Sequence, residues 1–412
     1  MIRRSQENAM KKQRRTIVLV LVAVVAAYLI FHYSREPEDE FGGGLDAFAQ
    51  KLDQVVPELL EQYQVPGTAV ALVHGGRVAW SKGYGLADEA TGTPVTPETV
   101  FQVASLSKPV TAWGVLRLVA QRKLALDAPA ESYLTRWHLP PSEFDHAEVT
   151  LRRLLNHTAG LSLGGYPGFD PSEKLPTLKE SLSGITGGVG DVHIAHLPDT
   201  RFSYSGGGYT LLQLIIEEVT GETFSAYMQS AVLAPLGMAR SSFEWTPALQ
   251  AVTATAYRGE PGQPLSNYRF TALAAAGLYS TASDLARFVA AGMTGPNREP
   301  PGRGLLSPRD VESMFTPTVE MDASTSLGYG LGYGVRLLPG EIRMVSHSGG
   351  NRGWRARFAA LPDRGEGIVI LTNSDTGDGL TNDLLRFWSL WAARPAPESD
   401  QSLGSEPGEE KQ

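Results

Sequence analysis

The β-strand patterns of this sequence lie at its two ends, and helical patterns fill the middle. Residues 68–85 form two runs rich in β-branched and aromatic residues around a glycine pair, which predicts a hairpin. Residues 332–350, with a turn at Pro339-Gly340, and residues 354–374 repeat this pattern late in the chain. We therefore expect an α+β fold, in which one antiparallel sheet is built from both chain ends and flanked by helices.

Apolar residues at helical spacing occur before the first hairpin, through the middle of the chain and after the last hairpin. These segments are 45–67, 110–124, 210–221, 224–237, 281–292 and 383–393. The middle segments predict a mainly helical lobe inserted between the two halves of the sheet. Sites tend to form where two such lobes meet, so we expect the functional site there.

The composition fits a folded domain with a substantial core. Of the 412 residues, 42% are hydrophobic and 19% are charged, a length that allows one large domain or two ordinary ones. The net charge of −8 predicts no basic surface, so nucleic acid is not an expected partner. Cysteine is absent from the sequence, which excludes disulfides and cysteine-ligated zinc. Residues 393–412 are acidic and rich in Pro, Gly and Ser, which predicts a disordered tail after a folded domain at 46–392.

The N-terminus has the pattern of a membrane anchor. Residues 1–15 are rich in Lys and Arg, whereas residues 16–33 are apolar and contain no Lys, Arg, Asp or Glu. We expect a basic cytoplasmic head at 1–15, a signal anchor or transmembrane segment at 16–33 and a linker at 34–45. The chain would then be a single-pass protein of the cell membrane, with its domain on the extracytoplasmic (periplasmic or outer) side. Cleavage within Val25–Ala27 is the alternative.

A serine stands three residues before a lysine where an apolar helix begins. Because positions three apart share a helix face, the side chains of Ser105 and Lys108 can meet. Pro109 fits the first helical turn, which would place Ser105 near backbone N–H groups that stabilise negative charge. Serine is a weak nucleophile that needs a base, and a lysine can serve as that base in its neutral form. The alternative is that Ser107 caps the helix and Lys108 has no special role.

Two further groups of residues could belong to the same site. Tyr204 lies between two serines, just before three glycines and an apolar helix, and could present its phenol as a base. His347-Ser348-Gly349-Gly350 ends a β-run, and glycines there can direct a backbone N–H into a site. Taken singly, the first group is also typical of a capped helix and the second of a strand that ends in a turn.

The motifs SLSK, YSG and HSGG, in this order and spacing, resemble those of the serine β-lactamase and penicillin-binding superfamily. The closest likeness is to its branch of class C β-lactamases, D-alanyl-D-alanine carboxypeptidases and esterases. The stretches LLNHTAGL at 154–161 and AAGLYSTASDLARF at 275–288 add to it. The resemblance covers nearly all of residues 46–392 and implies a two-lobed fold with the site between the lobes.

The resemblance also implies the chemistry. Ser105 would be acylated, Lys108 and Tyr204 would share proton transfer, and the N–H groups of Ser105 and Gly350 would form an oxyanion hole. The chain would be a membrane-anchored serine hydrolase of esters, amides or D-amino peptides. It would act on a small-molecule or peptide acyl substrate and need no metal or other cofactor.

Two positions depart from the pattern of this branch. The second motif usually ends in an asparagine that binds the acyl side chain, and here that position is Gly206. The third motif is often Lys-Thr-Gly, whose lysine attracts a substrate carboxylate, and here it is His347-Ser348-Gly349. We expect the substrate site to be lined by Gly206, His347, Ser348 and Gly349. The two departures favour an esterase or broad acyl hydrolase over an efficient β-lactamase. Protonation of His347 would then strengthen binding of carboxylate-bearing substrates. Three nearby arginines could restore positive charge: Arg352, Arg355 and Arg357.

Three alternatives stay open at this point. Residues 160–164 (GLSLG) match the nucleophile elbow of α/β-hydrolases around Ser162, but the preceding residues predict a helix and the following ones a loop, where an elbow needs a strand and a helix. His193 and His196 could be metal ligands. The chain could also be a non-catalytic binding or scaffold protein of penicillin-binding type that keeps a hydrolase fold.

Overall fold

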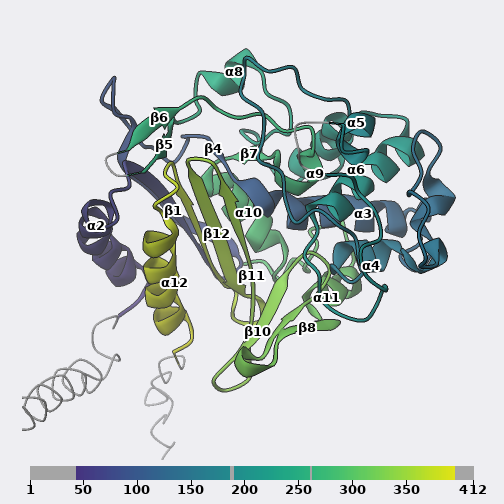
Figure 1. Ribbon diagram of the computed structural model, residues 1–412. Helices are drawn as coiled ribbons and strands as arrows, with labels where there is room; N and C mark the ends of the chain where they lie inside the picture. The colour runs from purple at the N-terminus through teal and green to yellow at the C-terminus, as the bar shows by residue number, and fades with distance from the viewer. Residues whose placement is uncertain (1–42, 186–189, 260–261, 395–412) are drawn as a thin grey trace, which may run out of the picture. The chain divides into compact units, whose positions relative to one another are not determined.

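The computed structural model describes residues 43–185, 190–259 and 262–394 (Figure 1). The predicted head at 1–15 and the predicted anchor at 16–33 lie outside these ranges, as does nearly all of the tail predicted at 393–412. Within the ranges described, no helix is both long and apolar enough to cross a membrane. The chain divides into two compact units at Lys51/Leu52, and the second unit contains all of the described strands and every candidate site residue.

In the described residues of this unit, nine strands form one antiparallel sheet in the order β3-β2-β1-β13-β12-β11-β10-β9-β8. The first strand of the chain pairs with the last along its length, so that Thr68 lies opposite Thr372 and Val73 opposite Gly367. The prediction that both chain ends build one antiparallel sheet is therefore confirmed. The strands are β1 (Gly67–His74), β2 (Arg77–Asp88), β3 (Thr93–Pro94), β8 (Val319–Asp322), β9 (Leu327–Tyr329), β10 (Gly334–Leu338), β11 (Ile342–Asn351), β12 (Trp354–Leu361) and β13 (Glu366–Thr372).

The predicted hairpins are also confirmed. The β1–β2 turn has Gly75 and Gly76 at φ values of 58° and 68°, in the left-handed region that glycine adopts without strain. A Cβ at Gly76 would lie 1.9 Å from the carbonyl oxygen of Thr294, so no larger residue fits there. The short strands β8 and β9 were not predicted, because runs of four and three residues are too short to show an alternating pattern.

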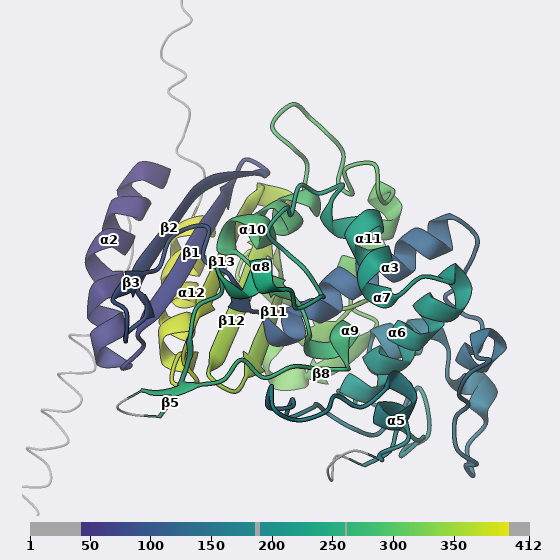
Figure 2. The same cartoon turned by 90° about the horizontal axis from the view of Figure 1, so that it is seen from above.

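Helices cover both faces of the sheet. Helix α10 packs on β1, β2 and β13, whereas α12 packs on β12 and β13 from the opposite face (Figures 1 and 2). Every residue of β13 is buried between these layers, which explains its unbroken apolar run. The helices are α2 (Leu45–Gln62), α3 (Ser107–Ala120), α4 (Leu151–Leu155), α5 (Leu178–Leu182), α6 (Gly206–Thr220), α7 (Phe224–Met228), α8 (Pro247–Gln250), α9 (Leu273–Ala276), α10 (Ala282–Ala291), α11 (Pro308–Phe315) and α12 (Asp378–Ala392).

The middle of the chain is mainly helical, as predicted, and its core is continuous with that of the sheet. The buried ring of Trp113 in α3 lies 5.3 Å, between centroids, from that of Phe288 in α10, which in turn lies 6.4 Å from that of Phe358 in β12. Helix α9 is held between α3 and α6. Short strand pairs complete the middle: β4 (Phe101–Gln102) with β7 (Tyr279–Ser280), and β5 (Ala256–Arg258) with β6 (Gln263–Leu265). The β4–β7 pair brings the chain just ahead of Ser105 close to α9.

Candidate active site

Ser105 lies in a tight turn between β4 and α3. The N–H of Val103 donates to the carbonyl oxygen of Leu278 at 3.1 Å, after which the backbone of Ala104 adopts a φ of 48°. A left-handed conformation is costly for a residue with a Cβ, and such strain concentrates at functional sites. Ser105 sits in the following 3₁₀ turn, η1 (Ala104–Leu106), and is partly exposed. The predicted serine therefore stands at the entrance of α3.

Ser107 does not cap α3. It is the first residue of the helix, and the N-cap residue Leu106 makes no side-chain capping bond. The Ser107 hydroxyl instead donates to the carbonyl oxygen of Ala104 at 2.6 Å and accepts the N–H of Leu278 at 3.0 Å. The capping alternative was wrong, because the fully buried hydroxyl is hydrogen-bonded to the strained turn at Ala104 and to the neighbouring chain at Leu278.

Lys108 reaches Ser105 as its spacing predicted. Its amine lies 3.1 Å from the Ser105 Oγ and donates to the carbonyl oxygen of Ala275 in α9 at 2.7 Å. Only 2% of Lys108 is exposed. The amine is thus held between the hydroxyl and a fixed carbonyl, which directs it at the Ser105 oxygen. The contact with Ala275 was not predicted, since a backbone carbonyl contributed by a distant helix leaves no signal in a motif.

Tyr204 flanks the amine. The Lys108 Nζ lies 4.9 Å from the centre of the Tyr204 ring and 5.6 Å from that of Tyr209. Tyr204 itself lies just before α6, whose N-cap Ser205 accepts the N–H of Gly208 at 2.9 Å. The three residues predicted as catalytic therefore lie together in the fold, although Ser105 and Tyr204 are 99 positions apart in the sequence.

The HSGG motif passes directly against the turn that carries Ser105. Strand β10 pairs with β11 only as far as Ser346, so among the described residues, 347–351 have no strand neighbour on that side. A Cβ at Gly349 would lie 2.3 Å from the carbonyl oxygen of Val103 and 3.1 Å from the Ser105 nitrogen. Glycine is thus required for this close approach. The oxyanion hole expected from the N–H groups of Ser105 and Gly350 stays a prediction.

His347 is buried, with hydrogen bonds at both ring nitrogens. It is 8% exposed, and its Nδ1 donates to the carbonyl oxygen of Ser348 at 2.7 Å while its Nε2 accepts from the hydroxyl of Tyr329 at 3.1 Å. Burial, followed by the charge of Lys108, lowers the pKa of His347 to about 3. Because both ring nitrogens are engaged inside the protein and the ring remains neutral near pH 7, this burial argues against the hypothesis that a protonated His347 binds a substrate carboxylate.

Gly206 is buried at the start of α6, where its N–H donates to the carbonyl oxygen of Gly164 at 3.2 Å. A Cβ at this position would lie 3.2 Å from that same oxygen and 3.3 Å from the Cα of Gly165. The loop at 164–165 thus lies where a side chain would begin. This close packing gives a physical reason for the departure from asparagine.

The three arginines differ in where they point. Arg355 lies opposite Gly350, and its Nε donates to Asp378 of α12 at 2.7 Å. Arg357 lies two residues further along β12 and therefore on this same face of the sheet, the one that α12 covers. Arg352, in the β11–β12 turn, stacks 4.4 Å over the ring of Tyr268 and donates to its hydroxyl at 2.8 Å. Arg352 therefore differs from the other two in lying in the turn that directly follows the HSGG strand.

The other candidate residues are engaged elsewhere. The Ser162 hydroxyl donates to the carbonyl oxygen of Asp191 at 2.7 Å and accepts the N–H of His193 at 3.0 Å, without the strand and helix of a nucleophile elbow. The His193 ring contacts the Asp191 carboxylate at 3.3 Å. In the ranges that the structure covers, no group of three or more His, Asp or Glu residues could hold a metal ion.

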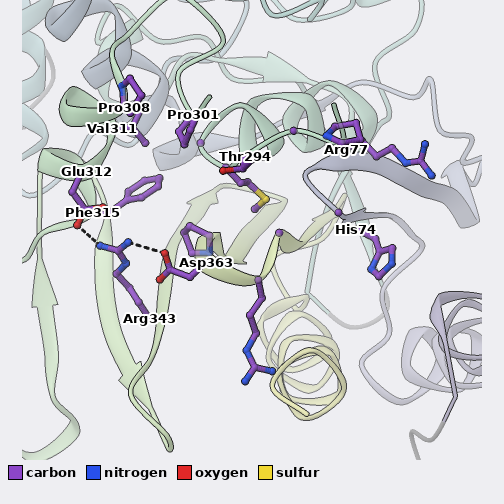
Figure 3. Close-up of a pocket in the computed structure, with 18 residues that line it drawn as sticks. His74, Arg77, Thr294, Pro301, Pro308, Val311, Glu312, Phe315, Arg343 and Asp363 are labelled. Atoms are coloured by element: carbon purple, nitrogen blue, oxygen red, sulfur yellow. Dashed lines mark hydrogen bonds and ion pairs between the residues drawn. The ribbon is translucent and has the colours of Figure 1, made fainter. Parts of the chain in front are cut away.

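A cavity of about 790 Å³ lies at the other end of β11, away from Ser105. Its most prominent polar feature is Arg343, whose guanidinium lies between the carboxylates of Glu312 and Asp363 (Figure 3). Proline, Phe315 and Met293 contribute much of the remaining wall. Because Arg343 is already paired with two carboxylates and neither Ser105 nor Lys108 lines this cavity, it is not the candidate active site.

Comparisons with known proteins identify the family to which the chain belongs. Residues 52–388 match the family model described as Beta-lactamase. Protein flp of Staphylococcus aureus (strain N315) is 24% identical over 334 residues, which cover 79% of this chain but only 63% of that protein. Esterase EstB of Burkholderia gladioli is 32% identical over 214 residues, 48% of this chain and 53% of that esterase. The octameric penicillin-binding protein homologue from Pyrococcus abyssi has a TM-score of 0.68 and 27% identity, covering 80% of this chain and 74% of its own. The chain belongs to the beta-lactamase family.

Proposed function

We propose that this protein is a serine hydrolase that forms an acyl-enzyme on Ser105. The observation that carries the proposal is the 3.1 Å contact between the buried amine of Lys108 and the Ser105 hydroxyl. A nucleophile within hydrogen-bond reach of a base, with that base oriented by a third group, is the arrangement of covalent catalysis. Here the third group is the carbonyl oxygen of Ala275.

Each residue of the site has its own part in the reaction. The Ser105 Oγ bonds to the substrate carbonyl carbon while its proton passes to Lys108 or Tyr204, and the carbonyl π electrons move onto oxygen. The N–H groups of Ser105 and Gly350 stabilise that oxyanion. Collapse of the adduct expels an alcohol or amine, which takes up the proton. A water then attacks the acyl carbon with the help of the same proton-transfer groups. The bond to the Ser105 Oγ breaks, the serine takes up the proton and the acid is released.

Esters or a broad range of acyl compounds are the proposed substrates, ahead of β-lactams. Gly206 offers no amide to bind an acyl side chain, and the neutral, internally bonded His347 offers no charge to a β-lactam carboxylate. The likeness to a protein named as an esterase supports the same choice. Turnover of short activated esters, D-amino peptides and β-lactams by the purified chain tests it. The proposal predicts that the esters are turned over fastest, and faster hydrolysis of β-lactams would contradict it.

A non-catalytic binding or scaffold role is the second candidate, favoured by the departures at Gly206 and His347. A fluorophosphonate that reacts with activated serines separates the two. The hydrolase predicts labelling of the wild type and none of Ser105→Ala, whereas a binding protein resists the label in both forms.

Anchoring in the cell membrane, with the domain on the extracytoplasmic side, also remains a proposal. Its support is the basic stretch at 1–15 followed by the apolar stretch at 16–33. Fractionation of cells that express the full chain, followed by protease treatment of intact spheroplasts, tests it. We expect the domain in the membrane fraction and accessible to the protease. A chain that begins after Val25–Ala27 would instead identify a cleaved signal.

A further inference from the structure

His157 holds the backbone on both sides of Tyr204. The carbonyl oxygen of His157 accepts the N–H of Ser203 at 2.8 Å, and its ring Nδ1 accepts the N–H of Ser205 at 3.1 Å. The imidazole also packs on the Tyr204 ring, with 4.3 Å between the two centroids. One residue therefore fixes the main chain before and after the phenol and supports the phenol itself.

The tautomer of His157 follows from these bonds. Because a backbone N–H donates to Nδ1, the neutral ring must carry its proton on Nε2. His157 is 2% exposed, and its Nε2 has no hydrogen-bond partner among the described residues. Burial, with smaller effects of Lys108 and His347, lowers the pKa of His157 well below its ordinary value, so the ring stays neutral. A buried donor without a partner is costly, and a side chain that only filled space would avoid that cost.

The backbone of His157 carries a second cost. Its φ is 62°, in the left-handed region that residues with a Cβ rarely adopt. The turn is fixed by Asn156, whose Oδ1 accepts the N–H and the hydroxyl of Thr158 at 3.1 and 2.8 Å. Strain and an unsatisfied donor thus coincide at one buried residue beside the candidate base. Such costs persist in structures where the geometry they maintain is used.

We propose that His157 is a positioning residue for Tyr204, which it holds in place beside Ser105 and Lys108 through its ring acceptor and its carbonyl oxygen. This role rests on the proposed function. His157 does not itself exchange a proton with the substrate, since four aromatic rings among the described residues enclose it: Phe202, Tyr204, Tyr209 and Tyr329. It acts on the reaction through the position of the Tyr204 phenol.

Two amide variants of the full chain test this role as a matched pair. Asparagine places an amide oxygen near the Nδ1 position and tolerates a positive φ, so His157→Asn keeps the acceptor for Ser205. Glutamine reaches the Nε2 position instead, so His157→Gln leaves that N–H without an acceptor. We expect kcat for an activated ester to fall about 10²-fold in His157→Gln with KM nearly unchanged, and less than about tenfold in His157→Asn. Equal losses in both folded variants would overturn the role.

A double-mutant cycle shows whether the effect passes through Tyr204. In a Tyr204→Phe background, His157→Gln should cause little further loss, because the group that it positions is gone. Two losses that multiply would identify a general structural effect and overturn the proposal. If His157→Gln does not fold, ¹⁵N spectra of the histidine-labelled wild type replace it. They should show the Nε2-protonated tautomer of His157 at every pH at which the protein is folded, and an Nδ1-protonated ring would overturn the assignment. A wild type that forms no acyl-enzyme would overturn the proposed function and this role together, whereas equal losses in an active enzyme overturn the role alone.

Discussion

The amine of Lys108 lies 3.1 Å from the hydroxyl oxygen of Ser105, in a place where only 2% of the lysine is exposed to solvent. Replacing the lysine by a side chain of similar length without an amine separates the chemical role of Lys108 from its packing. In Lys108→Met, we expect the rate of acylation to fall by about 10² to 10⁴, the usual contribution of a positioned base. The melting temperature should change little or rise, since a buried amine is costly to desolvate. Ester hydrolysis and calorimetry measure the two effects, and a folded Lys108→Met that acylates at the wild-type rate would contradict the account.

Two adjacent glycines of the HSGG motif should respond differently to the same added methyl group. A Cβ at Gly349 would lie 2.3 Å from the carbonyl oxygen of Val103, whereas the atom nearest a Cβ at Gly350 is an Arg355 nitrogen at 3.5 Å. Gly349→Ala should therefore push β11 away from the serine turn, destabilise the protein by about 1–3 kcal/mol and reduce acylation strongly. Gly350→Ala should be tolerated, because it keeps the backbone N–H. Denaturant unfolding and acylation rates of both variants check this, and equal effects would be evidence against the close approach.

The stability of the protein should fall as the pH is lowered through the acidic range. The pKa of His347 is lowered from 6.5 to about 3, and that of His157 is also well below 6.5. Between pH 3 and 6.5 the unfolded chain binds protons that the folded chain does not. The contribution of the buried neutral rings to the free energy of unfolding is therefore complete above pH 6.5 and is lost as the pH falls towards 3. Each histidine adds a slope of up to about 1.4 kcal/mol per pH unit.

Urea unfolding of the wild type and one variant over that pH range provides the measurement. His347→Gln should flatten the pH dependence of the free energy of unfolding. The same pH dependence in His347→Gln and in the wild type would show that the buried ring is not the group that titrates.

Substrate binding should not follow the titration of His347. Because burial and the charge of Lys108 keep this ring neutral above a pH of about 3, it carries no charge to attract a carboxylate at neutral or mildly acidic pH. The KM for a carboxylate-bearing ester should therefore stay flat from pH 5 to 8 relative to that for its neutral methyl ester. A ratio of the two KM values that rises near pH 6.5 would show that His347 is protonated in the site after all.

The sequence was sufficient for those features that depend on local pattern. The glycine and proline turns, with β-rich runs on both sides, predicted the hairpins, and the spacing of Ser105 and Lys108 predicted their contact. The short strands β8 and β9 could not be predicted, because four and three residues cover at most two periods of the alternation that identifies a strand.

The features that the sequence could not provide all depend on distant segments that come together. The burial of His347 requires Tyr329 from β9, and the direction of the Lys108 amine requires the carbonyl of Ala275. His157 was visible in LLNHTAGL only as part of a family likeness, since its bonds to the chain around Tyr204 span 46 to 48 positions. A histidine in a motif shows neither its tautomer nor its solvent exposure, and these two properties decide its chemistry.

Intact-mass spectrometry of the full chain after mixing with a short activated ester tests the central claim most directly. Wild type and Ser162→Ala should both gain the mass of one acyl group within the first turnovers and then lose it, because Ser162 is bonded to Asp191 and His193 and takes no part in the reaction. Ser105→Ala should gain nothing. An adduct that persists in folded Ser105→Ala, or no adduct on a folded wild type, would contradict the acyl-enzyme mechanism proposed for Ser105.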